Sequence, residues 1–279
     1  ALADAFLRRT QGRLLLLPRL LPLGGLGEDE PDPAAGDDPI DLPPAVPPLT
    51  RHLMLTRLVA SMAAARDGRP TPPDQAARLA ADLAALLDEV RGERLDFAAL
   101  DRLVPDELAD HWRLTLDFLG LLSRTWPAVL AETGAIEPAE HLDRAVAARI
   151  ERWRAAPPAH PVVVAGSTGS RPAVADLIAA VAALPDGRVV LPGLDQEMDA
   201  ATWAAVDPAH PQYGMKRLLE RLGATRAQVA PLVATPDPTA ARSRLLAEAL
   251  RPADTCEAWR DLTGAGGAVW PADSLDGVT

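Results

Sequence analysis

The residues best suited to chemistry lie in two short stretches, each of which follows an apolar run. The first is AGSTGSR, residues 165–171, in which Ser167, Thr168 and Ser170 alternate with Gly166 and Gly169. A strand that runs into a glycine-rich turn before a helix is a common phosphate site in α/β proteins. This loop lacks the lysine of the GxxxxGK[ST] pattern, so it predicts at most one bound phosphate or sulfate on amides and hydroxyls. The alternative is a tight turn that needs its two glycines for their backbone angles.

The second stretch is LPGLDQEMD, residues 191–199, which places three acids and an amide at the end of the next apolar run. If this run is a parallel strand, Asp195, Gln196, Glu197 and Asp199 gather at the sheet edge where α/β ligands bind. Carboxylate and amide oxygens there could hold Mg²⁺. The alternative is an acidic loop that caps the following helix.

Other chemistries find little support in the residue types. The sequence GSTGS has Thr168 where a GxSxG hydrolase motif has its serine, so no serine triad is expected. Cys256 is the single cysteine and has no nearby histidine, and the five histidines show no metal-ligand spacing. The sequence therefore predicts no catalytic residue, and no metal site apart from the Mg²⁺ alternative at residues 195–199.

The charge balance bears on partners and compartment. The net charge is −11, and Lys216 is the only lysine among 28 basic residues. An acidic chain repels nucleic acid unless its basic residues are gathered in one place. A single cysteine and the lack of a long apolar window favour a cytoplasmic protein that does not enter a membrane. The best local cluster of basic residues is Lys216, Arg217 and Arg221, to which Arg171 and Arg188 could add, so any DNA contact is expected at these five residues.

The elements that would position these residues form a strand–helix–strand unit. PVVVAG (161–166) and GRVVLPG (187–193) read as buried strands, with a proline-opened helix from Arg171 between them. HPQYGMKRLLERLG (210–223) then gives a helix that stops at Gly223. A connection of this length predicts a parallel sheet. RLLLLPRL (13–20) reads as one further short buried strand, after a helix over residues 1–9.

Between these α/β segments the pattern is helical. Residues 49–156 carry apolar stripes at helical spacing. One long helix, or two with a kink near Pro127, is expected over 105–130. We therefore predict an α/β domain formed by 1–48 (with 24–48 as an acidic Pro/Gly loop) and 157–250, a helical insert over 49–156, and an irregular tail over 251–279. The expected core positions of the insert are Leu79, Leu83, Leu86, Leu87, Val90, Trp112, Phe118, Trp126, Leu142, Val146, Ile150 and Trp153.

Three of these stretches, VVVAGSTGSRP, RVVLPGLDQEMD and HPQYGMKRLLERLG, together resemble the AddB family of AddAB helicase–nucleases in its alphaproteobacterial form. The opening ALADAFLRR…GRLLLLPRLLPLG is similar to the early part of the same family. The resemblance covers about residues 1–20 and 50–250. It implies a RecA-like fold of the superfamily 1 helicase type, a parallel sheet interrupted by an all-helical insert. An α/β domain with a helical insert is also what the periodicity of the apolar residues predicts.

The resemblance also implies that the domain has lost catalysis. In active relatives the strand corresponding to VVVAGST ends in an Asp-Glu pair that binds Mg²⁺ and positions the attacking water. Ala165 and Gly166 stand at this degenerate Walker B position. Gly193, Asp195 and Gln196 resemble the Gly-Asp…Gln motif of the next strand, motif III. The Walker A loop is expected upstream of residue 1. The family's iron–sulfur cluster belongs to a C-terminal nuclease domain, so no cofactor is expected in this fragment.

The sequence leaves three functions open. The first is a non-catalytic helicase-like part of a double-strand-break repair subunit, which acts with an AddA-like helicase–nuclease on DNA and leaves no pocket of convergent polar groups. The second is a nucleotide- or phosphate-binding α/β enzyme, which requires Asp195 or Glu197 within reach of the glycine loop. The third is a protein–protein interaction module, which requires a large apolar patch on residues 50–156.

Overall fold

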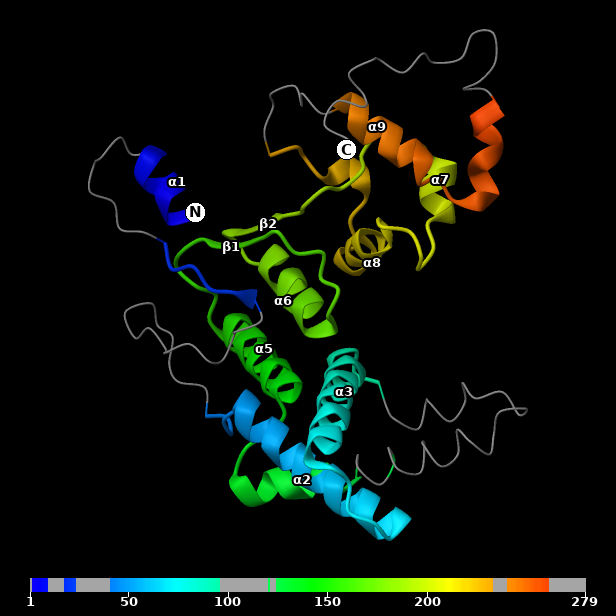
Figure 1. The fold of residues 1–279 in the computed structure, drawn as a ribbon. Helices are drawn as coiled ribbons and strands as arrows, with labels where there is room; N and C mark the ends of the chain where they lie inside the picture. The colour runs from blue at the N-terminus through cyan, green and yellow to red at the C-terminus, as the bar shows by residue number, and fades with distance from the viewer. Residues whose placement is uncertain are drawn as a thin grey trace. The chain divides into compact units, whose positions relative to one another are not determined.

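The structure is a computed structural model, and it describes residues 2–9, 18–23, 41–95, 120, 124–232 and 240–260. The chain divides into two compact units, Ala1–Arg149 and Ile150–Thr279. The named elements, shown in Figure 1, are α1 (Leu2–Arg9), α2 (Pro48–Asp67), α3 (Pro73–Gly92), α5 (Pro138–Ala155), β1 (Val162–Ala165), α6 (Pro172–Ala182), β2 (Gly187–Val190), α7 (Ala200–Ala205), α8 (Tyr213–Leu222), the 3₁₀ turn η5 (Arg226–Gln228), α9 (Ala240–Ala249) and the 3₁₀ helix η6 (Ala253–Ala258).

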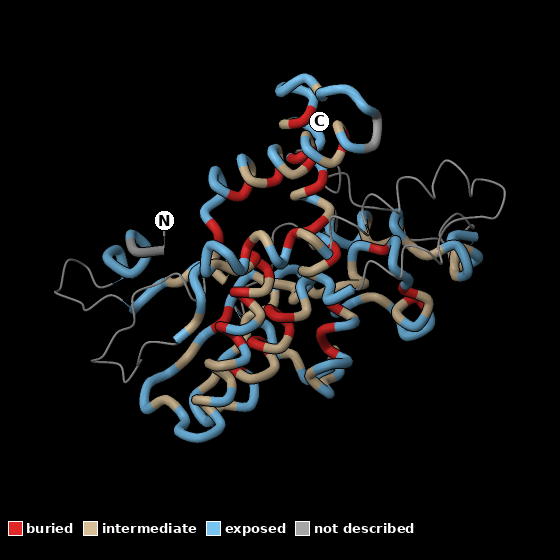
Figure 2. Tube along the Cα trace, turned by 90° about the horizontal axis from the view of Figure 1, so that it is seen from below, coloured by how far each residue is buried: buried red, intermediate tan, exposed pale blue. Residues whose placement is uncertain are grey.

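The first unit is built around the helices α2 and α3, which pack on each other and have 20 residues each. Each begins with a proline, a residue that suits the first helical turn. Residues 124–133 form a further helix, and Trp126 at 1 % exposure lies in the same apolar core as Leu55 and Leu87. Buried positions recur along α2 and α3 between exposed ones, and Figure 2 shows this mixture of buried and exposed positions along helical turns. The core prediction is confirmed for Leu83, Leu87, Val90, Trp126, Leu142 and Val146, whereas Leu79 is 44 % exposed and Leu86, Ile150 and Trp153 are half-buried.

The domain boundaries differ from the predicted ones. Val46 donates to the Ile136 carbonyl at 2.9 Å and its side chain lies in the core of the first unit, so residues near 45 pack with the helices. The division between units falls inside α5, after Arg149, and not at residue 156. Residues 253–258 form η6, so the expected irregular tail begins with regular structure. Trp112, Phe118, most of the expected helix 105–130 and residues 10–17 lie outside the described residues; the described Pro18–Leu20 form no strand.

The second unit contains the predicted strand–helix–strand connection. β1 pairs with β2 in parallel, with Val162 opposite Gly187 and Ala165 opposite Val190, and α6 packs on both strands. α6 starts at Pro172 and buries a stripe that includes Ile178, while α8 packs on α6 and ends at Gly223 in the left-handed region. The parallel pairing and these helix ends are confirmed.

The burial of the strands is lower than the apolar runs predicted. Val164 is 6 % exposed but Val163 is 58 % exposed, and no residue of β2 is buried. Side chains of a strand alternate between the two faces of a sheet, and α6 covers the face that carries Val164. The described residues thus give a two-stranded sheet that is covered on one face, and the RecA-like architecture stays a prediction.

Candidate functional site

Three stretches that are separate in the sequence meet at the carboxyl ends of β1 and β2. The AGSTGSR loop follows β1, the PGLDQ turn follows β2, and HPQYG forms the start of α8. Gln212 joins the last two, because its Oε1 accepts from the Asp195 amide at 3.2 Å and its Nε2 donates to the Gly193 carbonyl at 2.9 Å. His210 in turn accepts the Gln212 amide on Nδ1 at 3.0 Å. This bridge was not predicted, since spacing alone does not show which loop an amide side chain will reach.

The glycine loop packs closely against α6 and α8. Gly169 has a φ of +64°, and a Cβ there would lie 3.1 Å from Leu218 Cδ1 and 3.3 Å from Ala175 Cα. A Cβ at Gly214 would lie 3.8 Å from the Thr168 side chain. Ser167 Oγ accepts from the Gly169 amide at 3.1 Å, so one of the three hydroxyls serves the loop itself. These contacts favour the packed-turn interpretation of the loop.

Ala165 and Gly166, which were predicted to be a degenerate Walker B position, carry no ionisable group. Ala165 is the last residue of β1, and the Gly166 amide extends the ladder by donating to the Val190 carbonyl at 3.1 Å. Gly166 has a φ of +77°, a region that L side chains adopt only with strain. A glutamate at residue 166 would therefore be disfavoured by the backbone as it stands.

Each acid of the LDQEMD stretch accepts hydrogen bonds or forms an ion pair within the protein. Asp195 Oδ1 accepts from the amides of Glu197 and Met198, both at 2.9 Å, and Glu197 pairs with Arg244. Asp199 caps α7, because its Oδ1 accepts from the Thr202 amide at 2.8 Å. The helix-capping interpretation is confirmed for Asp199. Among the described residues, no group of three or more His, Cys, Asp or Glu side chains is placed to hold a metal ion.

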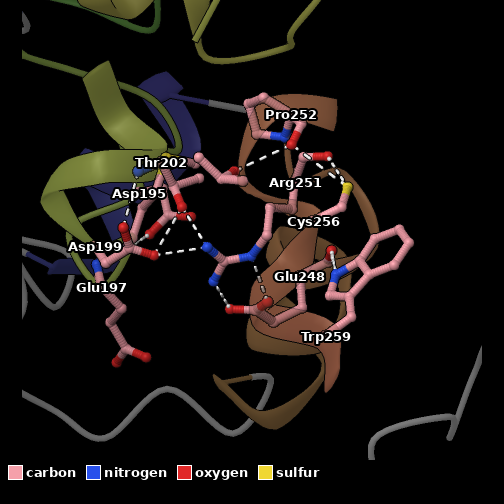
Figure 3. Close-up of polar contacts among 11 residues, drawn as sticks. Asp195, Glu197, Asp199, Thr202, Glu248, Arg251, Pro252, Cys256 and Trp259 are labelled. Carbon is pink, nitrogen blue, oxygen red and sulfur yellow. Dashed lines mark hydrogen bonds and ion pairs between the residues drawn. The ribbon is translucent and has the colours of Figure 1, made fainter. Parts of the chain in front are cut away.

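Asp199 belongs to a polar cluster that the sequence did not indicate (Figure 3). Hydrogen bonds from the amide and hydroxyl of Thr202, together with the Arg251 guanidinium, hold the pKa of the Asp199 carboxyl well below its usual range. Arg251 forms a two-pronged pair with Glu248, at 2.6 Å and 2.8 Å, which raises the Arg251 pKa. Both groups are therefore charged across the ordinary pH range.

Gln196, the last motif III-like residue, turns away from the glycine loop. Its Nε2 donates to the Val229 carbonyl. It contributes to a groove of about 270 Å³ at the end of β2, whose ten lining residues carry no charge: Val189, Val190, Leu191, Gly193, Leu194, Gln196, Val229, Ala230, Pro231 and Leu232. A groove without cations is poorly suited to a phosphate.

The five candidate DNA-binding residues separate into two groups. Lys216 Nζ donates to the carbonyls of Ala204 and Val206, at 2.9 Å and 3.1 Å, and Arg221 pairs with Asp176. Arg217 is exposed and lies over the Tyr213 ring at 5.9 Å. Arg171 and Arg188 are exposed on either side of α6. The ammonium of Lys216 thus binds the carbonyls at the end of α7, where a cation also complements the helix dipole.

Removing the Lys216 ammonium is expected to destabilise the second unit. Lys216→Met leaves two carbonyls at the end of α7 without their charged donor, and we expect a loss of about 1–2 kcal/mol in urea denaturation. The matched control is the neighbouring Arg217→Met, which removes an exposed cation and should change stability by less than about 0.5 kcal/mol. Equal stability of the two variants would contradict the assignment of Lys216 to α7.

Comparison with known proteins identifies no relative. No family model, curated protein or solved structure was found to match this chain. No helix in the described part of the chain is both long and apolar enough to cross a membrane.

Proposed function

We propose that this chain is the non-catalytic, helicase-like part of a subunit for double-strand-break repair, which acts with an AddA-like helicase–nuclease in DNA end resection. The observation that supports this proposal is the packing at the carboxyl ends of β1 and β2. α/β proteins usually bind their ligands at this edge, but here α8 packs on the glycine loop through Leu218 and Gly214. At this edge, the residues that resemble helicase motifs make packing contacts.

The groups near this edge support the proposed lack of catalysis. Hydrolysis of a nucleoside triphosphate needs a carboxylate for Mg²⁺ and a group that orients the attacking water. Ala165 and Gly166 offer neither, and Oδ1 of Asp195 already accepts hydrogen bonds from two backbone amides. With a net charge of −11, the chain also depends on a partner for most of its attraction to DNA.

Calorimetric titration of the full chain with Mg²⁺-ATP, and separately with Mg²⁺-ADP, tests the loss of catalysis. We expect no saturable heat with either nucleotide at micromolar to millimolar concentration. Saturable micromolar binding would contradict the proposal and favour the phosphate-binding enzyme, in which case Ser170→Ala should weaken binding.

The DNA contact is tested in the complex with an AddA-like subunit. Arg217→Glu and Arg171→Glu each reverse an exposed charge, so both should weaken single-stranded DNA binding and reduce its salt dependence. The control is Arg154→Glu, which reverses an exposed arginine of α5 that pairs with Glu151. If the chain does not co-purify with the partner, or if all three variants bind DNA equally, the repair-subunit proposal fails.

A further inference from the structure

The segment from Ala240 to Arg260, here called the C-terminal strap, is attached to its unit without a core of its own. It consists of α9, a turn and η6, and every residue from 242 to 260 is half-buried or exposed. Leu246, Leu250 and Trp259 are 51 %, 49 % and 41 % exposed. By contrast, α6 in the same unit buries six residues. Segments with few buried contacts open at a lower free energy than the core of a protein.

Arg251 connects the strap to residues 195–202, here called the acidic turn. Its Nη1 lies 2.8 Å from Asp199 Oδ2 and also donates to the Thr202 hydroxyl (Figure 3). The same guanidinium forms its two-pronged pair with Glu248, inside the strap. The Arg251 side chain is 10 % exposed, so it is the least exposed ion-pairing side chain of this contact.

A second arginine of the strap also binds the acidic turn. Arg244 Nε lies 2.5 Å from Glu197 Oε2, with both side chains about 60 % exposed. Exposed pairs contribute little and are screened by salt, whereas a contact made by a largely desolvated arginine is stronger. The fork to Glu248 lies inside the strap, so it orients the Arg251 guanidinium but does not itself bind the acidic turn. Arg251 is therefore the main positioning residue, and Arg244 adds a weaker, salt-dependent contact.

The charges of the two parts are complementary. The acidic turn carries Asp195, Glu197 and Asp199. Two of these pair with arginines of the strap, Glu197 with Arg244 and Asp199 with Arg251. Asp199 keeps its hydrogen bonds from Thr202 whether or not Arg251 is present, because both partners belong to the start of α7. The turn can therefore persist when the strap leaves, and its carboxylates then face solvent.

We propose that the C-terminal strap is an electrostatic latch that opens and closes over the acidic turn while the β1–α6–β2 core stays folded. Closing pairs Glu197 and Asp199 with arginines of the strap, and opening presents the acidic turn to solvent. This device is independent of the repair function proposed above, since it needs neither nucleotide nor DNA.

Hydrogen exchange of the full chain, resolved by peptide, tests the latch. In Arg251→Met, amides of the strap should exchange faster by about tenfold or more, while those of β1 and α6 stay unchanged. Raising the salt concentration should speed exchange of the strap in the wild-type chain, and less so in Arg251→Met. Arg251→Lys keeps the charge and should restore part of the protection. Arg154→Met, which breaks an exposed pair in α5, should change nothing in the strap.

Two results would overturn the latch. If Arg251→Met and salt both leave strap exchange unchanged, charge does not hold the strap. If α6 and the strap accelerate together in Arg251→Met, the strap belongs to the cooperative core and does not open by itself. Both outcomes are independent of whether the chain binds nucleotide or DNA.

Discussion

Gly187→Ala is expected to destabilise the β1–α6–β2 core strongly. A Cβ at residue 187 would lie 1.8 Å from the carbonyl oxygen of Val181 and 2.9 Å from its carbonyl carbon. The clash is with backbone at the end of α6, which cannot turn aside as a side chain could. Gly187 also opens β2 and pairs with Val162, so moving it disturbs the strand ladder. Forced overpacking of this kind costs about 3 kcal/mol or more.

The controls for Gly187 are glycines in open surroundings. Gly166 and Gly193 have φ values of +77° and +64°, and nothing lies within 4 Å of a Cβ built on either. Alanine at these positions should cost only the backbone strain, roughly 1–2 kcal/mol. Urea denaturation followed by circular dichroism gives the ranking. The steric argument fails if Gly187→Ala is as stable as Gly193→Ala.

The local features of this fold could be predicted because they depend on neighbours in sequence. Pro172 opens α6 and Gly223 ends α8, since each sets or permits a particular backbone angle. Asp199 caps α7 for the same local reason. The parallel pairing followed from two apolar runs with a helix between them, and that spacing leaves little choice of topology.

The missed features depend on contacts between distant residues. Gln212 reaches a turn 17 residues away, and Arg251 reaches Asp199 across 52 residues. Periodicity identifies an apolar stripe but not how much of it a neighbour covers, so Leu79 and Val163 were expected inside and are exposed. Lys216 stays a candidate DNA-binding residue by prediction; its contact with the end of α7 was not foreseen, because a cluster of cations in sequence does not reveal which of them binds a helix end.

Breaking the buried ion pair of the first unit is expected to have the second large effect. Glu137, just before α5, is 1 % exposed, and its Oε2 lies 2.7 Å from Nη2 of Arg51, which is 8 % exposed and also pairs with Asp88. Trp126 Nε1 donates to the other oxygen of Glu137. This cluster joins α2, α3, helix 124–133 and the start of α5.

Glu137→Leu leaves Arg51 with one half-exposed partner and Trp126 with no acceptor, so we expect a loss of about 3–5 kcal/mol. Glu137→Gln keeps an acceptor for Trp126 and should lose less. Adding Arg51→Met to Glu137→Leu should recover much of the stability, because the cost arises from the buried charge left alone. Asp74→Asn, which breaks the exposed pair with Arg78, should cost at most about 1 kcal/mol. Additive losses in the double variant would show that the two charges do not act as a pair, and that general packing around Trp126 holds these helices together.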